Sequence, residues 1–473
     1  MGSDRRTASV LAALALIAGC APFPADLGPR PRLAEPRLGE VIAERGPERS
    51  AGESRWWESF GDVGLNRLVD EALSHNPTLA VAAARLAAAG ATARQAELDT
   101  EFHTSLDAGA QRSRISENGL FPPPLAGEVY NLADVTASVN YNLDWWGKNG
   151  ALVAAARENA QVAEAERAAA RLNVASLVVD SYFALANAIA QESLALQQAE
   201  KRKVRLALER SRYERGLISP YAVREAEQSL ARSEDALQRC HYEIRSARYR
   251  LAAAAGLGPG QAAELPPARL PEPVALPDAL PLDWLARRPD VAAQRLRVDA
   301  AADMTDAARA DFYPNINVML LAGVDSRSAA DLFSRSSATG SYGAAIHLPI
   351  FNVRSVQNRL RTREAEYAAA VGDYNRTVIE AARQAADSHA ALATLIERSE
   401  FQRRAVDAAA DAEALSASRF RNGLASRGDT LGAEISVLAQ RQSELETRTA
   451  RLRATVALYQ AIGGGWTTEK ERQ

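Results

Sequence analysis

The stretch "RYERGLIS" at residues 212–219 returns in closely related form as "RFRNGLAS" at residues 419–426. Each copy has a glycine where a helix must stop, because glycine adopts the left-handed conformation that closes the last carbonyl groups of a helix. Each copy then offers a serine, which is typical of the position that caps the next helix. The two stretches therefore predict tight turns between helices at residues 212–222 and 419–429.

The segments that precede these turns are rich in strong helix formers. Residues 148–214 and 354–421 contain no proline and are dominated by Ala, Glu, Arg, Gln and Leu. Small and apolar residues recur at alternating spacings of three and four, as in Leu172, Ala175, Val179, Tyr182, Ala186 and Ile189. This spacing is typical of coiled coils, so each turn is predicted to join two long helices in a hairpin.

The similarity extends beyond the turns and indicates an internal duplication. The turn glycines Gly216 and Gly423 lie 207 residues apart, and an offset of 212 residues matches Asn76-Pro77 with Arg288-Pro289. A period this long predicts duplicated domains and not a short-repeat solenoid. The predicted segments are repeat 1 at residues 56–259, a Pro-rich linker at 260–281, repeat 2 at 282–465 and a C-terminal tail at 466–473.

Each repeat also contains two segments in which apolar and polar residues alternate. Alternation with a period of two predicts β-strands with one apolar and one polar face. In a soluble protein such strands form a half-buried sheet, whereas in a membrane barrel the apolar face meets lipid. Four strands are too few to close a barrel, which takes about eight, so a membrane barrel would need several chains. The four predicted strands are residues 102–115, 131–146, 315–326 and 339–351.

The first twenty residues have the layout of a secretory signal. Arg5 and Arg6 precede a short apolar run that is too short to span a bilayer. The residues "IAGC" at 17–20 resemble a bacterial lipobox, which would make residues 1–19 a signal peptide and Cys20 a lipidated first residue. A cysteine that lies by coincidence near an ordinary cleavage site is the alternative. Residues 20–55 are rich in proline and predict an extended tether.

The sequence offers little that would support an enzyme or a nucleic-acid-binding protein. The formal net charge is -3, which leaves no broad basic face for nucleic acid. No phosphate-binding glycine loop, zinc-protease motif, serine-nucleophile motif or paired-cysteine metal motif is found, and the five histidines stand singly. We therefore expect no catalytic residue, no cofactor and no metal, and we interpret Cys240 as a structural residue.

Together these features resemble the bacterial outer-membrane efflux factors, the TolC and OprM-like channel proteins, and in particular the lipid-anchored NodT-type lipoproteins that serve RND pumps. The resemblance rests on the lipobox at Cys20, the duplicated unit, the segment "ARADFYPNINV" at 308–318 and the two turns. It implies a mainly α-helical chain with a β-barrel portion that assembles as a homotrimer. Three chains of four strands would then close a twelve-stranded outer-membrane barrel on a periplasmic α-helical barrel.

The resemblance also implies a function and roles for the turns. The trimer would be the exit duct of a tripartite pump, passively conducting drugs or other small molecules from an inner-membrane RND transporter and a periplasmic adaptor protein. Asp429, with Arg427 beside it, falls where the family has an aspartate that lines the closed periplasmic gate, although Asp429 also has the spacing of a helix cap with Ser426. Ala222 and Gly432 stand where some relatives carry further acidic residues. The expected adaptor-contact residues are Gly216, Leu217, Ser219, Gly423, Leu424 and Ser426.

Two other classes of export protein remain as alternatives. A periplasmic adaptor also has a long helical hairpin and often a lipid anchor, but it would show one hairpin between two halves of a small β domain. A structural coiled-coil spacer would leave the amphipathic strands unexplained. Both alternatives would lack a duplicated pair of strands and hairpins.

Overall fold

A computed structural model describes residues 22–24, 29–33, 55–273 and 288–464. The predicted signal peptide at residues 1–19, Cys20, much of the tether and the tail at 466–473 lie outside the described residues.

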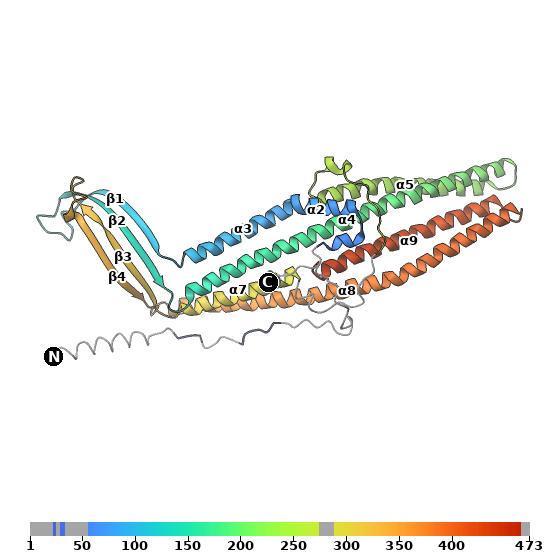
Figure 1. The fold of residues 1–473 in the computed structure, drawn as a ribbon. Coiled ribbons are helices and arrows are strands. Elements are labelled where there is room, and N and C mark those ends of the chain that lie inside the picture. The colour runs from blue at the N-terminus through green and yellow to red at the C-terminus, as the bar shows by residue number, and fades with distance from the viewer. Residues whose placement is uncertain (1–21, 25–28, 34–54, 274–287, 465–473) are drawn as a thin grey trace. The chain divides into compact units, whose positions relative to one another are not determined.

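The described chain is mainly helical and has one antiparallel sheet of four strands (Figure 1). The predicted fold class of two long helical hairpins and four strands is confirmed. Its elements are η2 (Trp56–Phe60), α2 (Val63–His75), α3 (Pro77–Leu98), β1 (His103–Arg114), β2 (Val129–Leu143), α4 (Lys148–Glu214), α5 (Pro220–Ala254), η3 (Pro259–Ala263), α7 (Pro289–Ala310), β3 (Asn315–Ser326), η4 (Arg335–Ser337), β4 (Ala338–His347), α8 (Val353–Arg421) and α9 (Arg427–Ala461).

Packing divides the chain into two compact units, and each unit takes segments from both halves of the sequence. Unit 1 comprises Met1–Leu33, Leu86–Ala163 and Gln294–Tyr374, and unit 2 comprises Ala34–Arg85, Glu164–Ala293 and Asn375–Gln473. The sequence repeats are therefore not separate packing units. Two strands or one hairpin bury too little apolar surface to be stable alone, so the copies combine.

The sheet has the strand order β1-β2-β3-β4, with every neighbouring pair antiparallel. Val139 in β2 lies opposite Thr104 in β1 and Leu320 in β3, and Tyr342 in β4 also lies opposite Leu320. Strands β1 and β4 form the two edges, so each is paired on one side only within the described chain. The unpaired backbone groups of these edges are available to further strands.

Two strands end earlier than the sequence predicts. Strand β2 ends at Leu143 because Asp144 accepts hydrogen bonds from the amides of Asn149 and Gly150, at 2.9 and 2.8 Å, and so begins α4. Strand β4 ends at His347, before Pro349, which has no amide to donate to a strand ladder.

The duplication is visible in equivalent hydrogen bonds. Asn76 Nδ2 donates to the carbonyl of Ala254 at 2.9 Å, and Arg288 Nη1 donates to the carbonyl of Ala461, also at 2.9 Å. Each donor precedes the proline that begins α3 or α7, and each acceptor is the last residue of α5 or α9. In both copies, a side chain thus binds the free carbonyl group at the end of the second hairpin helix, but the residue type differs.

The core of unit 2 forms where α4 meets α2 and η2. Tyr182 and Phe183 of α4 are fully buried and pack with Trp56 and Phe60. The Tyr182 hydroxyl donates to Asp62 Oδ2 at 2.7 Å, and burial raises the pKa of Tyr182 well above its usual range. This partly buried bond joins the N-terminal cap of α2 to the middle of α4.

Candidate functional site

The two hairpin turns have the same backbone geometry. Gly216 has a φ of 73° and Gly423 a φ of 74°, in the left-handed region that favours glycine. The amide of Leu217 donates to the carbonyl of Arg212 at 2.9 Å, and the amide of Leu424 donates to that of Arg419 at 2.8 Å. These bonds close the C-terminal ends of α4 and α8, as the repeated motif predicts.

Apolar side chains are exposed at both turns. Leu217 is 65% exposed and Leu424 is 70% exposed, and Tyr221 beside the first turn is 75% exposed. Closing a helix requires the glycine and the leucine amide, but not a leucine side chain. The turns therefore present apolar surface that their own fold does not use.

The helices that follow the turns begin differently. Ser426 Oγ accepts from the amide of Asp429 at 3.2 Å, and Asp429 Oδ2 accepts from the amide and hydroxyl of Ser426, at 2.9 and 2.8 Å. Asp429 therefore caps α9. These bonds from Ser426 hold the pKa of Asp429 below its usual range, with smaller contributions from Arg419 and Arg212.

The expectation that the Ser219 side chain caps α5 is wrong. Ser219 occupies the capping position with an extended backbone, but its side chain makes no capping hydrogen bond. Pro220 has no amide to donate, and the amide of Ala222 bonds to the Ser219 carbonyl at 3.3 Å. Ala222 also lacks the carboxylate that completes the reciprocal cap at Asp429.

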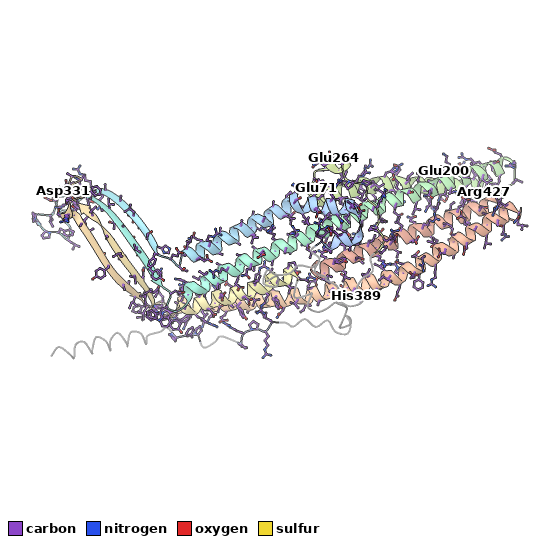
Figure 2. The ribbon with its side chains drawn as sticks, in the orientation of Figure 1. Glu71, Glu200, Glu264, Asp331, His389 and Arg427 are labelled. Atoms are coloured by element: carbon purple, nitrogen blue, oxygen red, sulfur yellow. The ribbon has the colours of Figure 1, made fainter. Side chains whose placement is uncertain are left out.

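A carboxylate connects the two hairpins close to the turns. Glu434 of α9 lies 3.0 Å from Arg427, in the first turn of the same helix, and 2.6 Å from Lys201 on α4. Arg427 lies near the turn of the second hairpin (Figure 2). Burial opposes ionisation of Glu434, whose side chain is 12% exposed, but the two cations outweigh burial and keep the pKa of Glu434 below its usual range.

A second carboxylate is held by two arginines, but within the first hairpin. Glu227 of α5 lies 2.8 Å from Arg210 on α4 and 2.7 Å from Arg224 on α5. Glu434 and Glu227 therefore form similar ionic contacts with different consequences, because only the contact at Glu434 joins one hairpin to the other.

Further polar contacts hold α4 against α9 along unit 2. Arg453 binds both carboxylate oxygens of Asp180, at 2.6 and 3.0 Å. Three other pairs of the same kind are Gln460–Asn173 at 2.9 Å, Thr449–Asn187 at 3.0 Å and Gln198–Gln442 at 3.3 Å. These polar pairs lie beside apolar contacts, because Leu452 and Val456 of α9 are buried in the same core as Tyr182 of α4.

The capping contact of Asp429 with Ser426, predicted from their spacing, is confirmed, whereas the sequence assigned no partner to Arg427. The structure places Asp429 on Ser426 and Arg427 on Glu434, while Lys201 was not among the predicted site residues. No pattern within α4 distinguishes Lys201 from its basic neighbours Arg202 and Lys203. Only the packing of α4 against α9 selects it.

Two general features of the described residues complete the site. Within residues 22–24, 29–33, 55–273 and 288–464, no group of three or more His, Cys, Asp or Glu residues is arranged to hold a metal ion.

Among the same residues, α4 is the one helix long and apolar enough to cross a membrane, and 61% of its apolar stretch is buried inside the protein. Such burial is typical of a core helix.

The hairpins, the four-stranded sheet and the duplication agree with one protein family. The sequence model of the family described as "Outer membrane efflux protein" matches residues 68–257 and 280–464. The chain belongs to this family. It is an efflux channel of the outer membrane, through which an efflux pump exports its substrates.

Individual relatives agree with this assignment over nearly the full chain. Multidrug resistance outer membrane protein MdtP of Escherichia coli (strain K12) is 28% identical, over 97% of this chain and 96% of MdtP. The crystal structure of the outer membrane protein VceC from Vibrio cholerae is 31% identical, with a TM-score of 0.79 over 88% of this chain and 100% of VceC. The outer-membrane channel OprN is 27% identical, with a TM-score of 0.83 over 94% of this chain and 100% of OprN.

Proposed function

We propose that this outer membrane efflux protein works as a homotrimer. Three four-stranded sheets would close a twelve-stranded barrel in the outer membrane, and the long hairpins would line a tunnel in the periplasm. The observation that carries this proposal is the amphipathic sheet, whose edges β1 and β4 have no further strand partner among the described residues. Such edges are tolerated in lipid only when they pair, and four strands are too few to pair with themselves.

The proposed trimer is the passive exit duct of a tripartite pump. An inner-membrane RND-type transporter would supply drugs or other small molecules, and a periplasmic adaptor would join that transporter to the duct. The name of MdtP, a multidrug resistance protein, supports small-molecule substrates. It also favours a transport role over an enzyme.

The adaptor would dock on the hairpin turns. Leu217 and Leu424 supply exposed apolar side chains, and Gly216 and Gly423 allow a partner to approach the backbone closely. Ser219 and Ser426 lie beside these leucines. A docking surface accounts for two exposed leucines that the turns do not need for their own geometry.

The closed gate would lie next to these turns. Around a threefold axis, three copies of Asp429 would form an anionic ring that attracts cations. The contact of Glu434 with Lys201 and Arg427 supports a closed state, because opening that moves the hairpins apart must break it.

The lipidation of Cys20 completes the proposal. Acylation would attach the N-terminus to the outer membrane, in which the barrel also resides, and would give the protein two independent membrane attachments.

Single-channel conductance in planar bilayers tests the proposed function. We expect a small conductance from purified parental trimers, and a larger or less cation-selective conductance from Asp429→Ala. Leu424→Ala, which alters a turn but no charge, is the control and should conduct like the parent. If Asp429→Ala leaves the conductance unchanged, Asp429 acts only as a helix cap. If folded trimers do not conduct, the result favours an adaptor or a spacer.

A further inference from the structure

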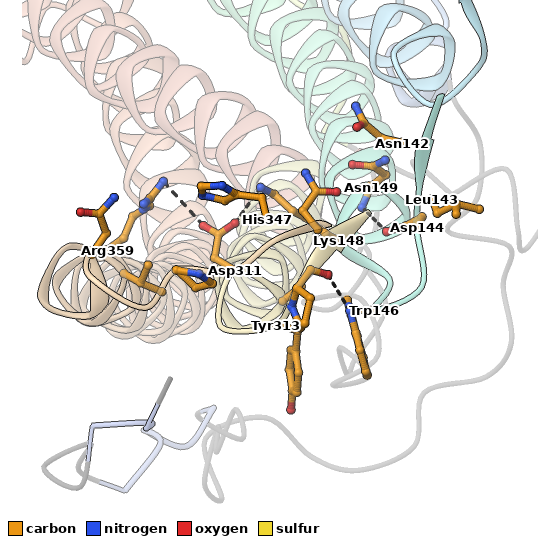
Figure 3. Close-up of a pocket in the computed structure, with 16 residues that line it drawn as sticks. Asn142, Leu143, Asp144, Trp146, Lys148, Asn149, Asp311, Tyr313, His347 and Arg359 are labelled. Carbon is orange, nitrogen blue, oxygen red and sulfur yellow. Dashed lines mark hydrogen bonds and ion pairs between the residues drawn. The ribbon is translucent and has the colours of Figure 1, made fainter. Parts of the chain in front are cut away.

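A polar cavity lies in unit 1, where the helices meet the sheet (Figure 3). Its volume is about 300 Å³, at the lower end of the range for small-molecule pockets. Asn142, Asn315 and His347 line it, and each alternates with apolar neighbours in its strand. Asn315 of β3 lies opposite His347 of β4, and Asn142 is the last residue but one of β2. The polar face of the sheet therefore forms one wall of the cavity.

Two cations and a carboxylate form another wall. Asp311 lies between Lys148 and Arg359 (Figure 3). Its Oδ1 is 2.6 Å from Lys148 Nζ, a distance typical of a charged hydrogen bond, whereas its Oδ2 is 3.7 Å from Arg359 Nη1, which is too long for one. Among the residues that the structure describes, the Arg359 guanidinium finds no closer acceptor. Asp311 therefore satisfies Lys148 but leaves the hydrogen-bond donors of Arg359 free.

The charge of this group favours an anionic ligand. Lys148, Arg359 and Asp311 carry two positive charges and one negative charge. Asp144 also lines the cavity, but its two oxygens accept the amides that follow the start of α4, as described above. The Arg359 side chain is more than half exposed, so a ligand can reach it. A guanidinium offers parallel N–H groups that match the two oxygens of a carboxylate.

The remaining lining suits an organic anion. Side-chain amides can donate further hydrogen bonds to an oxyanion, and Leu143 and Val356 add apolar surface. The amides that line the cavity belong to Asn142, Asn149, Asn315 and Asn352. A small molecule with a carboxylate and an apolar body would therefore find partners for both of its parts.

Contacts that do not involve the cations hold the cavity in shape. Trp146 Nε1 donates to the carbonyl of Pro314 at 2.9 Å, and the Trp146 ring stacks on Tyr313 at 4.6 Å. Both rings point away from Asp311 (Figure 3). Substitution of Arg359 should therefore change the charge of the cavity and leave its walls in place.

We propose that this cavity binds the carboxylate group of an exported small molecule at the point where the tunnel leads into the barrel. In the proposed trimer the polar face of the sheet meets the lumen, and the cavity lies at the end of the sheet that joins the helices. Binding there is weak and sensitive to salt, because both cations are about half exposed. A conduit needs sites of this kind, which release what they bind. This inference rests on the proposed trimeric duct, although binding itself can be measured without conduction.

Binding of para-fluorobenzoate to the purified full-length protein tests the site. Fluorine NMR measures the broadening of its signal, and para-fluorobenzamide, which has a similar shape but no charge, is the control ligand. We expect Arg359→Gln to weaken para-fluorobenzoate binding about fivefold, as for the loss of one exposed ion pair. Arg354→Gln is the matched control, because Arg354 is exposed on the same helix and does not line the cavity. Equal binding of the two ligands, or equal binding by the two variants, would overturn the inference.

Asp311→Asn should change binding in the opposite direction. The carboxylate of Asp311 competes with a ligand for Lys148 and Arg359. Its removal should therefore tighten para-fluorobenzoate binding about fivefold. A variant that merely damaged the fold would bind less, so the opposite signs separate a change at the site from a folding defect. Unchanged or weaker binding by Asp311→Asn would contradict the proposal.

Current through single trimers in planar bilayers tests whether the site lies in the duct. We expect para-fluorobenzoate, added to both sides, to cause brief reductions of the current in the parent and in Arg354→Gln but not in Arg359→Gln. Binding by NMR without any effect on the current would place the cavity outside the conduit and overturn the inference. Folded trimers that do not conduct would instead contradict the proposed channel, and the NMR measurements would still decide whether the cavity binds carboxylates.

Discussion

At the scale of single residues, equivalent positions of the two repeats make the same hydrogen bond with different side chains. Asn76 and Arg288 both bind the last carbonyl of a hairpin helix, although one is a short amide and the other a long cation. Ser219 and Ser426 show the reverse, because identical residues behave differently when the third following residue is Ala222 or Asp429. A motif therefore predicts a turn more reliably than it predicts the hydrogen bonds of each side chain.

Arg288 offers a test of the buried helix end. We expect Arg288→Met to lower the free energy of unfolding by about 1–3 kcal/mol, because the carbonyl of Ala461 and the partners Asp290 and Gln384 lose a nearly buried donor. Urea unfolding followed by circular dichroism measures the change. Arg295→Met is the control, since Arg295 is half exposed and forms an ion pair with Asp299, one turn away. Equal losses in both variants would contradict the role of the buried bond.

Asp429 offers a test at low pH. A carboxyl group whose pKa is lower in the folded state stabilises the fold above its unfolded pKa, which is about 4, and loses that contribution as the pH falls through the folded pKa. We therefore expect hydrogen exchange of amides 427–430, corrected for intrinsic rates, to speed up as the pH falls below about 4. Asp429→Asn should remove this dependence. The same pH dependence in both proteins would show that Asp429 is not its source.

At the scale of elements, α4 and α9 are joined both by polar contacts and by an apolar core that includes Leu452 and Val456 of α9. The contact of Arg453 with Asp180 and that of Lys201 with Glu434 lie between α4 and α9, and thus between the two hairpins. Exposed polar contacts such as that of Arg453 with Asp180 exchange with water at low net cost, whereas buried apolar contacts do not.

Glu434 and Glu227 form a matched pair for testing this interface. Glu434→Gln weakens the contact between the hairpins, whereas Glu227→Gln weakens a similar contact within one hairpin. We expect Glu434→Gln to raise single-channel conductance or open probability severalfold and Glu227→Gln to leave both near the parental values. Equal effects of the two variants would argue against a latch between the hairpins.

At the scale of the whole molecule, the proposed barrel depends on the two faces of the sheet. Tyr342 in β4 is 88% exposed and belongs to the apolar face, while the adjacent Ser341 points to the opposite face. In a barrel the apolar face meets lipid and the polar face meets the water-filled lumen. Introducing a charged side chain should therefore have different effects at neighbouring positions of one strand.

Arginine at these two positions tests that orientation. We expect Tyr342→Arg to cost about 2–4 kcal/mol per copy if the residue lies near the middle of the bilayer, and so to deplete folded trimers from the outer membrane. Ser341→Arg should assemble at nearly the parental level and change the conductance. The amount of heat-modifiable trimer in outer-membrane fractions measures assembly, and the opposite ranking of the variants would reverse the assignment of the faces.

Local sequence was sufficient to predict the helices and strands and their order along the chain. The turn glycines, the proline-free helical segments and the alternating strands each depend on residues close together in the chain, where backbone hydrogen bonds and side-chain periodicity are decided. The ends of β2 and β4 were predicted less well, because Asp144 and Pro349 compete with the alternation that continues past them.

Only the tertiary structure decided which side chains meet. Lys201 contacts Glu434 because α4 packs on α9 in one register, and Phe23 stacks on Phe312 although hundreds of residues separate them in the sequence. The tertiary structure also showed that both repeats contribute to each compact unit. The physical reason is that contacts between elements depend on the relative rotation and translation of those elements, which a repeat in one chain does not specify.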